Sequence, residues 1–328
     1  MIAPVVITPW HWAGFIGAVL LFLSLDLGVF HRRAHVVRFG EALVWTTIWF
    51  LLAMAFAFAF VAPNMGEQKT VVFLTGYITE LSLSMDNVFV IALIFAYFRV
   101  PTMYQHRVLF WGILGALVMR GAMILAGAAL INRFQWTLYF FALFLIYTGV
   151  KMIFSRAEGI EPEKNPFVRL ARKFYPVSNE FNGQRFTVRT GVARALTPLA
   201  IALLMIETVD LVFALDSIPA IFGFTTDPFI VFTSNVFAIL GLRSLYFVLA
   251  NAIGYFRFLK VGLSVVLVFI GIKMLLAPHA MAGRKFWFQV ELEPTVSLAI
   301  VASIIFVSIL TSVIVAWQEK SGQRRPPG

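Results

Sequence analysis

Acidic and amide side chains interrupt a long apolar stretch of the chain between residues 70 and 98. Glu80, Asp86 and Asn87 all lie inside it. An acid at the centre of a bilayer carries a penalty of roughly 2.5–3.5 kcal/mol, so a membrane segment keeps one where it faces a basic partner, a water-filled cavity or a cation. Carboxylate and amide oxygens are also the ligands that hard divalent ions such as Mn²⁺, Mg²⁺ and Ca²⁺ prefer.

The same arrangement recurs in a second apolar stretch further along the chain. Asp210 and Asp216 stand six positions apart, as the first two acids do, and Ser217 follows where the first stretch has an amide. Pro219 has no backbone N–H and therefore frees the carbonyl of Leu215, beside Asp216. We expect a broken helix at Pro219 and an oxygen-rich cation site next to it. Its predicted ligands are Asp86, Asn87, Leu215 (through its carbonyl), Asp216 and Ser217.

Four other carboxylates lie at membrane depth, and their roles are open. They can bind a second cation, relay protons, or pair with basic side chains of neighbouring apolar segments. These acids are Asp26, Glu80, Glu207 and Asp210, and the candidate basic partners are Arg120, Arg243, Lys151 and Lys273. Pure charge pairing is the structural alternative to a cation site, although both lysines are near enough to segment ends to reach the headgroups. Asn235 is a site residue or makes a hydrogen bond between helices.

The elements that must position these groups are membrane-spanning helices. Of the 328 residues, 60% are hydrophobic and 13% are charged, whereas soluble domains have about 25% charged residues. Because helices satisfy every backbone hydrogen bond within long apolar runs, we predict an all-α polytopic membrane protein. The nine apolar segments span residues 10–30, 41–62, 70–98, 106–131, 136–154, 196–222, 229–250, 258–276 and 295–317. The chain has no cysteine, which excludes disulfides and thiolate metal ligands.

Lys and Arg gather in every second loop, which places those loops in the cytoplasm. The chain then begins outside and ends inside, and its first segment is predicted to be a retained helix because no basic region precedes it. This sorting accounts for the net charge of +10 and argues against nucleic-acid binding, which needs one basic face. The long loop 155–195 is expected to hold a short basic amphipathic helix at 167–174 and a brief strand at 186–189. It is a connector lying on anionic headgroups, or a partner site.

The two halves of the chain carry related motifs in the same order. After the acid pairs come Arg120 and Arg243, and then Gly149-Val-Lys-Met and Gly271-Ile-Lys-Met. Each half holds three segments, an odd number, so the second half enters the membrane from the opposite side. We predict an inverted 3+3 repeat, as in many secondary transporters, in which the second acids of the two halves meet across the repeat interface. The predicted divisions are accessory segments 1–69, first repeat 70–154, cytoplasmic loop 155–195, second repeat 196–278, and outer loop, last helix and tail 279–328.

Residues 80–94 and 206–247 resemble the TerC family of integral membrane proteins, which is grouped with LysE-type exporters. The likeness extends over residues from about 10 to 280. It implies manganese efflux, as in Alx-type members, or a tellurite-resistance phenotype. It also places the acidic membrane residues of the family on Asp86 and Asp216.

Two functional hypotheses follow. In the first, the chain is a secondary transporter of the bacterial inner membrane that exports a hard divalent cation, Mn²⁺ before Ca²⁺, in exchange for protons. In the second, it is a membrane scaffold of the stress-resistance type, whose acids are internal struts and whose loop 155–195 docks a partner. The sequence has no nucleophile–base motif, phosphate-binding loop or nucleotide domain, so an enzyme or an ATP-driven pump is not expected. The expected partners are the bilayer, the divalent ion and protons, with no resident cofactor and no nucleic acid, and the oligomeric state is open.

Overall fold

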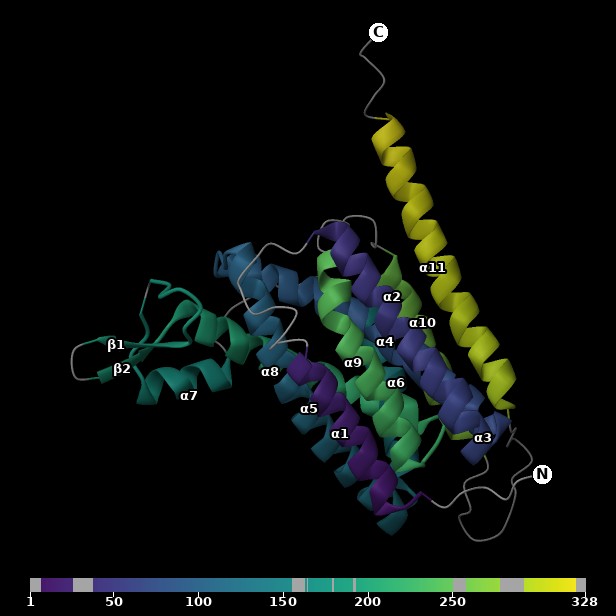
Figure 1. Ribbon diagram of the computed structural model, residues 1–328. Coiled ribbons are helices and arrows are strands. Elements are labelled where there is room, and N and C mark those ends of the chain that lie inside the picture. The colour runs from purple at the N-terminus through teal and green to yellow at the C-terminus, as the bar shows by residue number, and fades with distance from the viewer. Residues whose placement is uncertain are drawn as a thin grey trace.

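The computed structural model describes residues 7–25, 38–154, 163, 165–178, 180–190, 193–249, 258–277 and 292–322. Within these ranges the chain is almost entirely helical (Figure 1). Eight helices are long and apolar enough to cross a membrane, and a shorter apolar helix covers Pro9–Ser24. The expectation of an all-α polytopic membrane protein is therefore confirmed, with one short helix among the predicted segments.

The helices of the bundle follow the apolar segments of the sequence. They are α1 (Pro9–Leu25), α2 (Phe39–Phe56), the π-helical turn η2 (Ala57–Val61), α3 (Ala62–Met65), α4 (Glu67–Tyr97), α5 (Thr102–Arg133), α6 (Thr137–Phe154), α8 (Pro198–Phe222), α9 (Pro228–Leu249), α10 (Leu259–Leu276) and α11 (Pro294–Gly322). Helix α2, η2 and α3 together make one span. Helices α4 and α5 begin three or four residues before the apolar segments do, since the polar residues at their starts are also helical.

Proline and glycine set two of the helix ends. Pro198 lies in the first turn of α8, where its missing N–H costs no helical hydrogen bond. Gly66 ends α3 with a φ of 89°, a conformation that glycine adopts without the penalty other residues pay. Because Gly66 also precedes the first residue of α4, the chain turns from one span into the next within a single residue.

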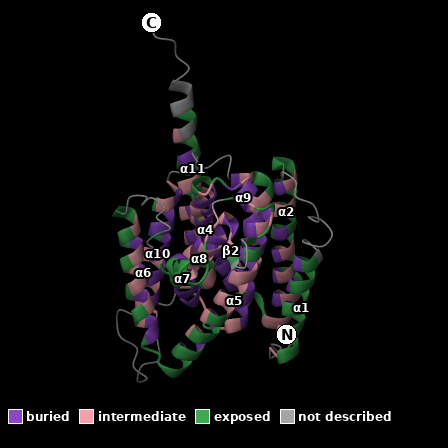
Figure 2. Cartoon of the chain, turned by 90° about the vertical axis from the view of Figure 1, so that its left-hand side faces the viewer, coloured by how far each residue is buried: buried purple, intermediate pink, exposed green. Residues whose placement is uncertain are grey.

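Helix α9 is the centre of the bundle. The apolar window of α9 is 100% buried inside the protein, whereas the windows of α2 and α11 are 22% and 17% buried. Helix α9 packs against α2, α4 and α5, and Figure 2 shows exposed residues gathering on the peripheral helices. The outer helices thus offer apolar surface to lipid, and the polar residues of α4, α5, α8 and α9 face one another.

Helices α6 and α10 pack through two glycines that contact the opposite backbone. A Cβ added at Gly149 would lie 2.9 Å from the carbonyl oxygen of Ser264, and one at Gly271 would lie 2.7 Å from the carbonyl oxygen of Ala142. From one contact to the other, the residue number rises along α6 while it falls along α10, so the two helices run antiparallel. Gly149 meets Ser264, seven positions before Gly271, and Gly271 meets Ala142, seven positions before Gly149. The two contacts are therefore reciprocal.

A small arm follows α6 and precedes α8. We use "arm" for the described residues between 165 and 196, which contain α7 (Pro166–Phe174) and the antiparallel hairpin of β1 (Thr187–Thr190) and β2 (Ala193–Leu196). The short helix and the strand expected in this loop are both present. Figure 1 shows the arm extending sideways from the bundle. The Thr197 hydroxyl donates to the Arg185 carbonyl at 2.8 Å and ties the arm to the start of α8.

Candidate functional site

A buried arginine of α5 lies at the centre of the polar interior. Arg120 is 1% exposed, and its guanidinium donates to both carboxylate oxygens of Asp210, from Nε at 3.2 Å and from Nη2 at 2.8 Å. Its Nη1 forms an ion pair with the Glu80 carboxylate. Two-point binding of a carboxylate by guanidinium is strong and directional. The first acids of the two halves are therefore joined through one cation.

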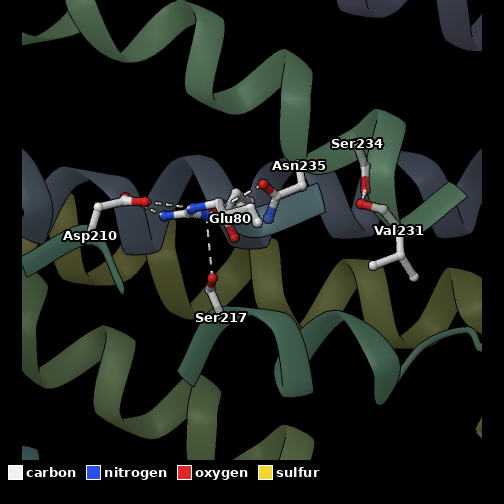
Figure 3. A network of polar contacts seen from close by, with 7 residues as sticks. Glu80, Asp210, Ser217, Val231, Ser234 and Asn235 are labelled. Carbon is white, nitrogen blue, oxygen red and sulfur yellow. Dashed lines mark hydrogen bonds and ion pairs between the residues drawn. The ribbon is translucent and has the colours of Figure 1, made fainter. Parts of the chain in front are cut away.

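Two neutral side chains complete this cluster. Ser217 Oγ accepts from Arg120 Nη1 at 3.3 Å, and Asn235 Oδ1 accepts from the same nitrogen at 3.4 Å. Figure 3 shows Glu80, Asp210, Ser217 and Asn235 converging on one place from different directions. We call these four residues and Arg120 the Arg120 cluster. It joins α4, α5, α8 and α9 at a single point.

Helices α4 and α8 run antiparallel past the Arg120 cluster. A Cβ added at Gly76 would lie 3.5 Å from the Ile221 side chain, Glu80 and Ser217 share Arg120 Nη1, and Asn87 lines a cavity together with Asp210. Across these three pairs, each step forward along α4 is matched by an equal step backward along α8. Glu80 of α4 therefore lies level with Ser217 of α8, and Asp210 of α8 lies level with Asn87 of α4.

The cavity shared by Asn87 and Asp210 lies between the same four helices. About 20 Å³ of it is accessible to a water-sized sphere, and a polar cavity holds a water once this volume exceeds about 10–15 Å³. Arg243 also lines the cavity, and apolar side chains such as Ile91 and Ile206 form the rest of the wall. The cavity thus has room for one water or one small ion beside Asp210.

Helix α4 presents a row of buried oxygens that have no hydrogen-bond partner within the protein. They are Glu80 Oε2, Ser84 Oγ and Asn87 Oδ1. Positions separated by four and then three residues lie on one helix face, so the three oxygens line up from the Arg120 cluster to the cavity. Most buried polar atoms in proteins are paired, and a run of unpaired acceptors therefore marks a place that a proton, a water or a cation can fill.

Glu207 adds a third carboxylate to this region. It lies one turn before Asp210 on α8, close enough for the two carboxylates to interact, and its Oε2 is buried without a hydrogen-bond partner within the protein. Its carboxylate lies directly against Gly115 of α5, where a side chain would clash with it. Nothing in the local sequence distinguishes Gly115 from the other glycines of α5, so the sequence alone could not have paired it with Glu207.

The second acids of the two halves have different basic neighbours. Asp86 interacts with Lys260, whereas Asp216 lies beside Thr148 and Lys151 of α6. When Glu80 is level with Ser217 and Asn87 with Asp210, Asp86 and Asp216 differ in level by five residues, or about 7.5 Å along the helix axis. The described residues contain no group of three or more His, Asp or Glu side chains able to hold a metal ion. A cation between Asp86 and Asp216 therefore stays a prediction.

The expected break in α8 at Pro219 is absent. The helix continues through Pro219 to Phe222 and ends at Gly223, so the hydrogen bond that the proline removes does not end the helix at this point. The Leu215 side chain is about half exposed on the outside of the bundle, while Ser217 faces the Arg120 cluster. The Leu215 carbonyl as a cation ligand stays a prediction.

The remaining predicted residues have varied surroundings. Lys273 lies over the Phe224 ring, 4.5 Å from its centroid, and within the described residues it has no ion pair with the predicted acids. Lys151 is near Asp216, and Arg243 is buried at the cavity. Asp26 lies outside the described residues. Among the basic residues considered as partners, Arg120 meets the first acids of both apolar stretches.

Comparison with known proteins identifies the family. The sequence profile described as "Integral membrane protein TerC family" matches residues 65–320. The chain belongs to the TerC family. It is 51% identical to an uncharacterized membrane protein of Myxococcus xanthus, over 95% of this chain and 94% of that protein. It is 46% identical to the "Putative membrane-bound redox modulator Alx" of Salmonella typhi, over 82% of this chain and 86% of that protein.

A relative of the same name from Escherichia coli is 42% identical over 94% of this chain and 95% of its own length. No solved structure matches this TerC protein. The family, the bacterial relatives and the apolar helices together confirm a multi-pass protein of the bacterial inner membrane. They also confirm the resemblance drawn from residues 80–94 and 206–247.

Proposed function

We propose that this TerC protein is a secondary transporter that exports a hard divalent cation, Mn²⁺ before Ca²⁺, in exchange for protons. The observation that carries the proposal is the buried row of unpaired oxygens on α4, Glu80 Oε2, Ser84 Oγ and Asn87 Oδ1, between the Arg120 cluster and a cavity of ion size. Carboxylate, hydroxyl and amide oxygens without thiolates suit hard divalent ions.

The charge balance supports a cationic substrate. Three carboxylates, Glu80, Glu207 and Asp210, lie in this region with two guanidinium groups, those of Arg120 and Arg243. Uncompensated charge in a low-dielectric interior is costly, so the surplus carboxylate favours binding a cation or a proton. In the described state Arg120 occupies the place between Glu80 and Asp210 that an ion would take.

We infer that Arg120 and the transported ion compete for the same carboxylates. An ion that enters from the cavity at Asn87 reaches Asp210 first and draws this carboxylate away from Arg120. When the ion leaves, protons or Arg120 neutralise the acids again, which gives a physical basis for coupling to protons. Asp86 and Asp216 lie near basic residues at other depths, and their part in the route is proposed as entry and exit rather than as a shared site.

The internal symmetry of the contacts supports the inverted 3+3 repeat. Reciprocal contacts occur between α6 and α10 and between α4 and α8, as two copies related by a twofold axis in the membrane plane would produce. Secondary transporters with inverted repeats bind their substrates near the midplane at the repeat interface, and the Arg120 cluster is formed by residues of both halves. The division at residues 70–154 and 196–278 stays part of this proposal.

A scaffold is the second candidate, and one observation favours it. Arg120 already satisfies Asp210 and one oxygen of Glu80, as internal struts would require. Some relatives carry the name of a redox modulator, but this chain has no cysteine, so a thiol-based redox role is not open to it.

The test is ion flux into liposomes that contain the purified full chain and an internal metal indicator. Mn²⁺, Ca²⁺ and Mg²⁺ are compared with and without a pH gradient. Asn87→Leu keeps the branching and the number of heavy atoms of the side chain but removes its oxygen. We expect the Mn²⁺ flux at subsaturating concentration to fall about tenfold or more, as the loss of a metal-site partner does.

Asn64→Leu is the matched control for this experiment. Asn64 of α3 donates to the Phe60 carbonyl at 2.7 Å, away from the Arg120 cluster, so its flux should equal that of the wild type. If Asn87→Leu transports as the wild type does, the oxygen row is not the route. If the wild-type protein moves none of the three ions under either condition, transport is wrong and the scaffold is favoured.

A further inference from the structure

Helix α7 of the arm carries a stripe of exposed apolar side chains. Phe167, Leu170 and Phe174 are 46%, 55% and 69% exposed. Their spacing of three and four residues places them on one face of the helix. Three large apolar side chains in a row on an exposed helix are more than scattered surface hydrophobics, and such a patch marks a contact with a partner or a membrane.

The basic residues of α7 lie on a different face. Arg169, Arg172 and Lys173 cluster about 140° around the helix from the apolar stripe, at 100° per residue. Between the two faces lies Val168, which is fully buried and belongs to the same core cluster as Leu199 of α8. The helix therefore has one side attached to the bundle, one apolar side and one basic side.

The start of α7 is fixed by its sequence and by α8. Asn165 Oδ1 accepts from the backbone N–H groups of Phe167 and Val168 at 2.9 and 3.1 Å, and Pro166 occupies the first turn, both of which favour helix initiation. The same oxygen lies 3.5 Å from Thr208 Oγ1. Thr208 is ten residues into α8, about 15 Å from its first residue.

This contact holds the start of α7 against the flank of α8, on the side of the bundle where α8 begins. Figure 1 shows α7 on the lower edge of the sideways arm, next to α8, with the hairpin of β1 and β2 above it. The basic residues match the negative surface potential of a leaflet that contains anionic lipids.

We propose that α7 is an interfacial anchor that binds anionic phospholipid headgroups. Phe167, Leu170 and Phe174 lie in the boundary between headgroups and acyl chains, and Arg169, Arg172 and Lys173 contact the lipid phosphates. Amphipathic helices with aromatic or Leu residues on one face and Lys or Arg on the other bind membranes in this way. Because α7 packs on α8 through Val168, lipid binding would hold the first half of α8, which carries Glu207 and Asp210. The inference does not depend on which ion the protein moves.

The absence of native cysteines permits a direct test with single labels. Leu170→Cys and Arg172→Cys, on opposite sides of α7, are each labelled with an environment-sensitive fluorophore on the full chain in nanodiscs. The discs contain phosphatidylcholine alone or with phosphatidylglycerol. We expect a blue-shifted emission, quenched by lipid-borne quenchers, at position 170 in the anionic discs, and a more polar and less quenched spectrum at position 172 in both.

The charge requirement is tested in the Leu170→Cys background. Each basic side chain near an anionic surface is worth about a fivefold change in attachment, so Arg169→Gln, Arg172→Gln and Lys173→Gln together should abolish the dependence on phosphatidylglycerol. Arg185→Gln, Arg189→Gln and Arg194→Gln remove the same charge from the hairpin side of the arm and should leave the spectrum unchanged.

Three results would overturn the proposal. One is an aqueous spectrum at position 170 in both kinds of disc, which would mean that water or a soluble partner covers the stripe. Another is equal immersion at positions 170 and 172. The third is an equal loss of immersion in the two triple variants, since that would reflect the total charge of the arm and not a site on α7. Size-exclusion profiles and helical circular dichroism confirm folding of each variant.

Discussion

Arg120 illustrates how one side chain can hold four helices together inside a membrane protein. Its guanidinium forms ion pairs with Glu80 and Asp210. Because Arg120 is only 1% exposed, bulk water cannot replace these partners. A buried ion pair adds little net stability when it forms, but removing one partner leaves the other charges uncompensated and is strongly destabilising. The largest effect of Arg120 on stability is therefore expected when it is removed, because Glu80 and Asp210 would then be buried without a counter-charge.

Arg120→Gln should destabilise the protein by about 3–5 kcal/mol, since two carboxylates would then share a buried site without a cation. The measurement is thermal unfolding of the purified full chain in detergent. Arg133→Gln is the control on the same helix, because Arg133 is exposed at the end of α5, and it should change stability by less than about 0.5 kcal/mol. Equal unfolding temperatures for the two variants would contradict the central role of Arg120.

Gly115 and Glu207 form a second pair that depends on shape. Gly115→Ala should displace the Glu207 carboxylate and cost about 1–3 kcal/mol by overpacking, measured by the same unfolding assay. Glu207→Ala should suppress this cost in the double variant. Gly17→Ala on α1, where an added Cβ meets nothing within 4 Å, should be neutral or slightly stabilising. Additive costs in the double variant would show that the two residues do not share one space.

Two pairs of elements, α4 with α8 and α6 with α10, give the bundle its internal order. In both pairs the helices run antiparallel, and residues at matching motif positions lie at the same level on the two helices. Small residues allow this close approach, as is common at helix interfaces in membranes. The α6–α10 interface depends on Gly149 and Gly271, and the α4–α8 interface depends on the Arg120 cluster.

Gly149→Ala and Gly271→Ala should destabilise the protein by similar amounts, about 1–3 kcal/mol each. In both cases the new methyl group meets a backbone carbonyl, which cannot rotate away as a side chain can. The double variant should cost less than the sum, because the helices separate once for both methyl groups. Thermal unfolding of the three variants beside Gly14→Ala checks this, and a neutral effect at either glycine would refute the reciprocal packing.

At the scale of the whole molecule, the arm marks one side of the membrane. Helix α8 starts directly after the arm, and α4 runs antiparallel to α8, so the start of α4 lies at the end of the bundle opposite to the arm. The distribution of Lys and Arg predicts that the arm is cytoplasmic. The predicted topology, with the N-terminus outside and the C-terminus inside, then follows from alternation of the spans.

Single cysteines test this topology in intact cells. A membrane-impermeant thiol reagent should label Glu67→Cys, at the exposed start of α4, and should label Asn182→Cys in the arm only after the cells are broken. The cysteine-free wild type gives the background. The reverse pattern would invert the topology and make the proposed direction of transport wrong.

The sequence by itself determined the class of protein and singled out polar groups that need partners inside the membrane. Long apolar runs require helices because lipid offers no hydrogen bonds to the backbone, and the same reasoning separated out Glu80, Asp210, Arg120 and Ser217 as groups needing partners. Helical periodicity also placed Glu80, Ser84 and Asn87 on one face. These conclusions depend on composition and on spacing within a single helix, which the chain specifies locally.

Only the tertiary structure decided which of these groups meet. The sequence led us to pair the second acids, Asp86 and Asp216, yet the structure joins the first acids through Arg120 and gives the second acids other neighbours. The break expected at Pro219 is likewise absent. Spacing along a helix fixes the face of a residue but not the depth and rotation at which two helices cross, and those are set by close packing at residues such as Gly76, Gly115 and Gly149.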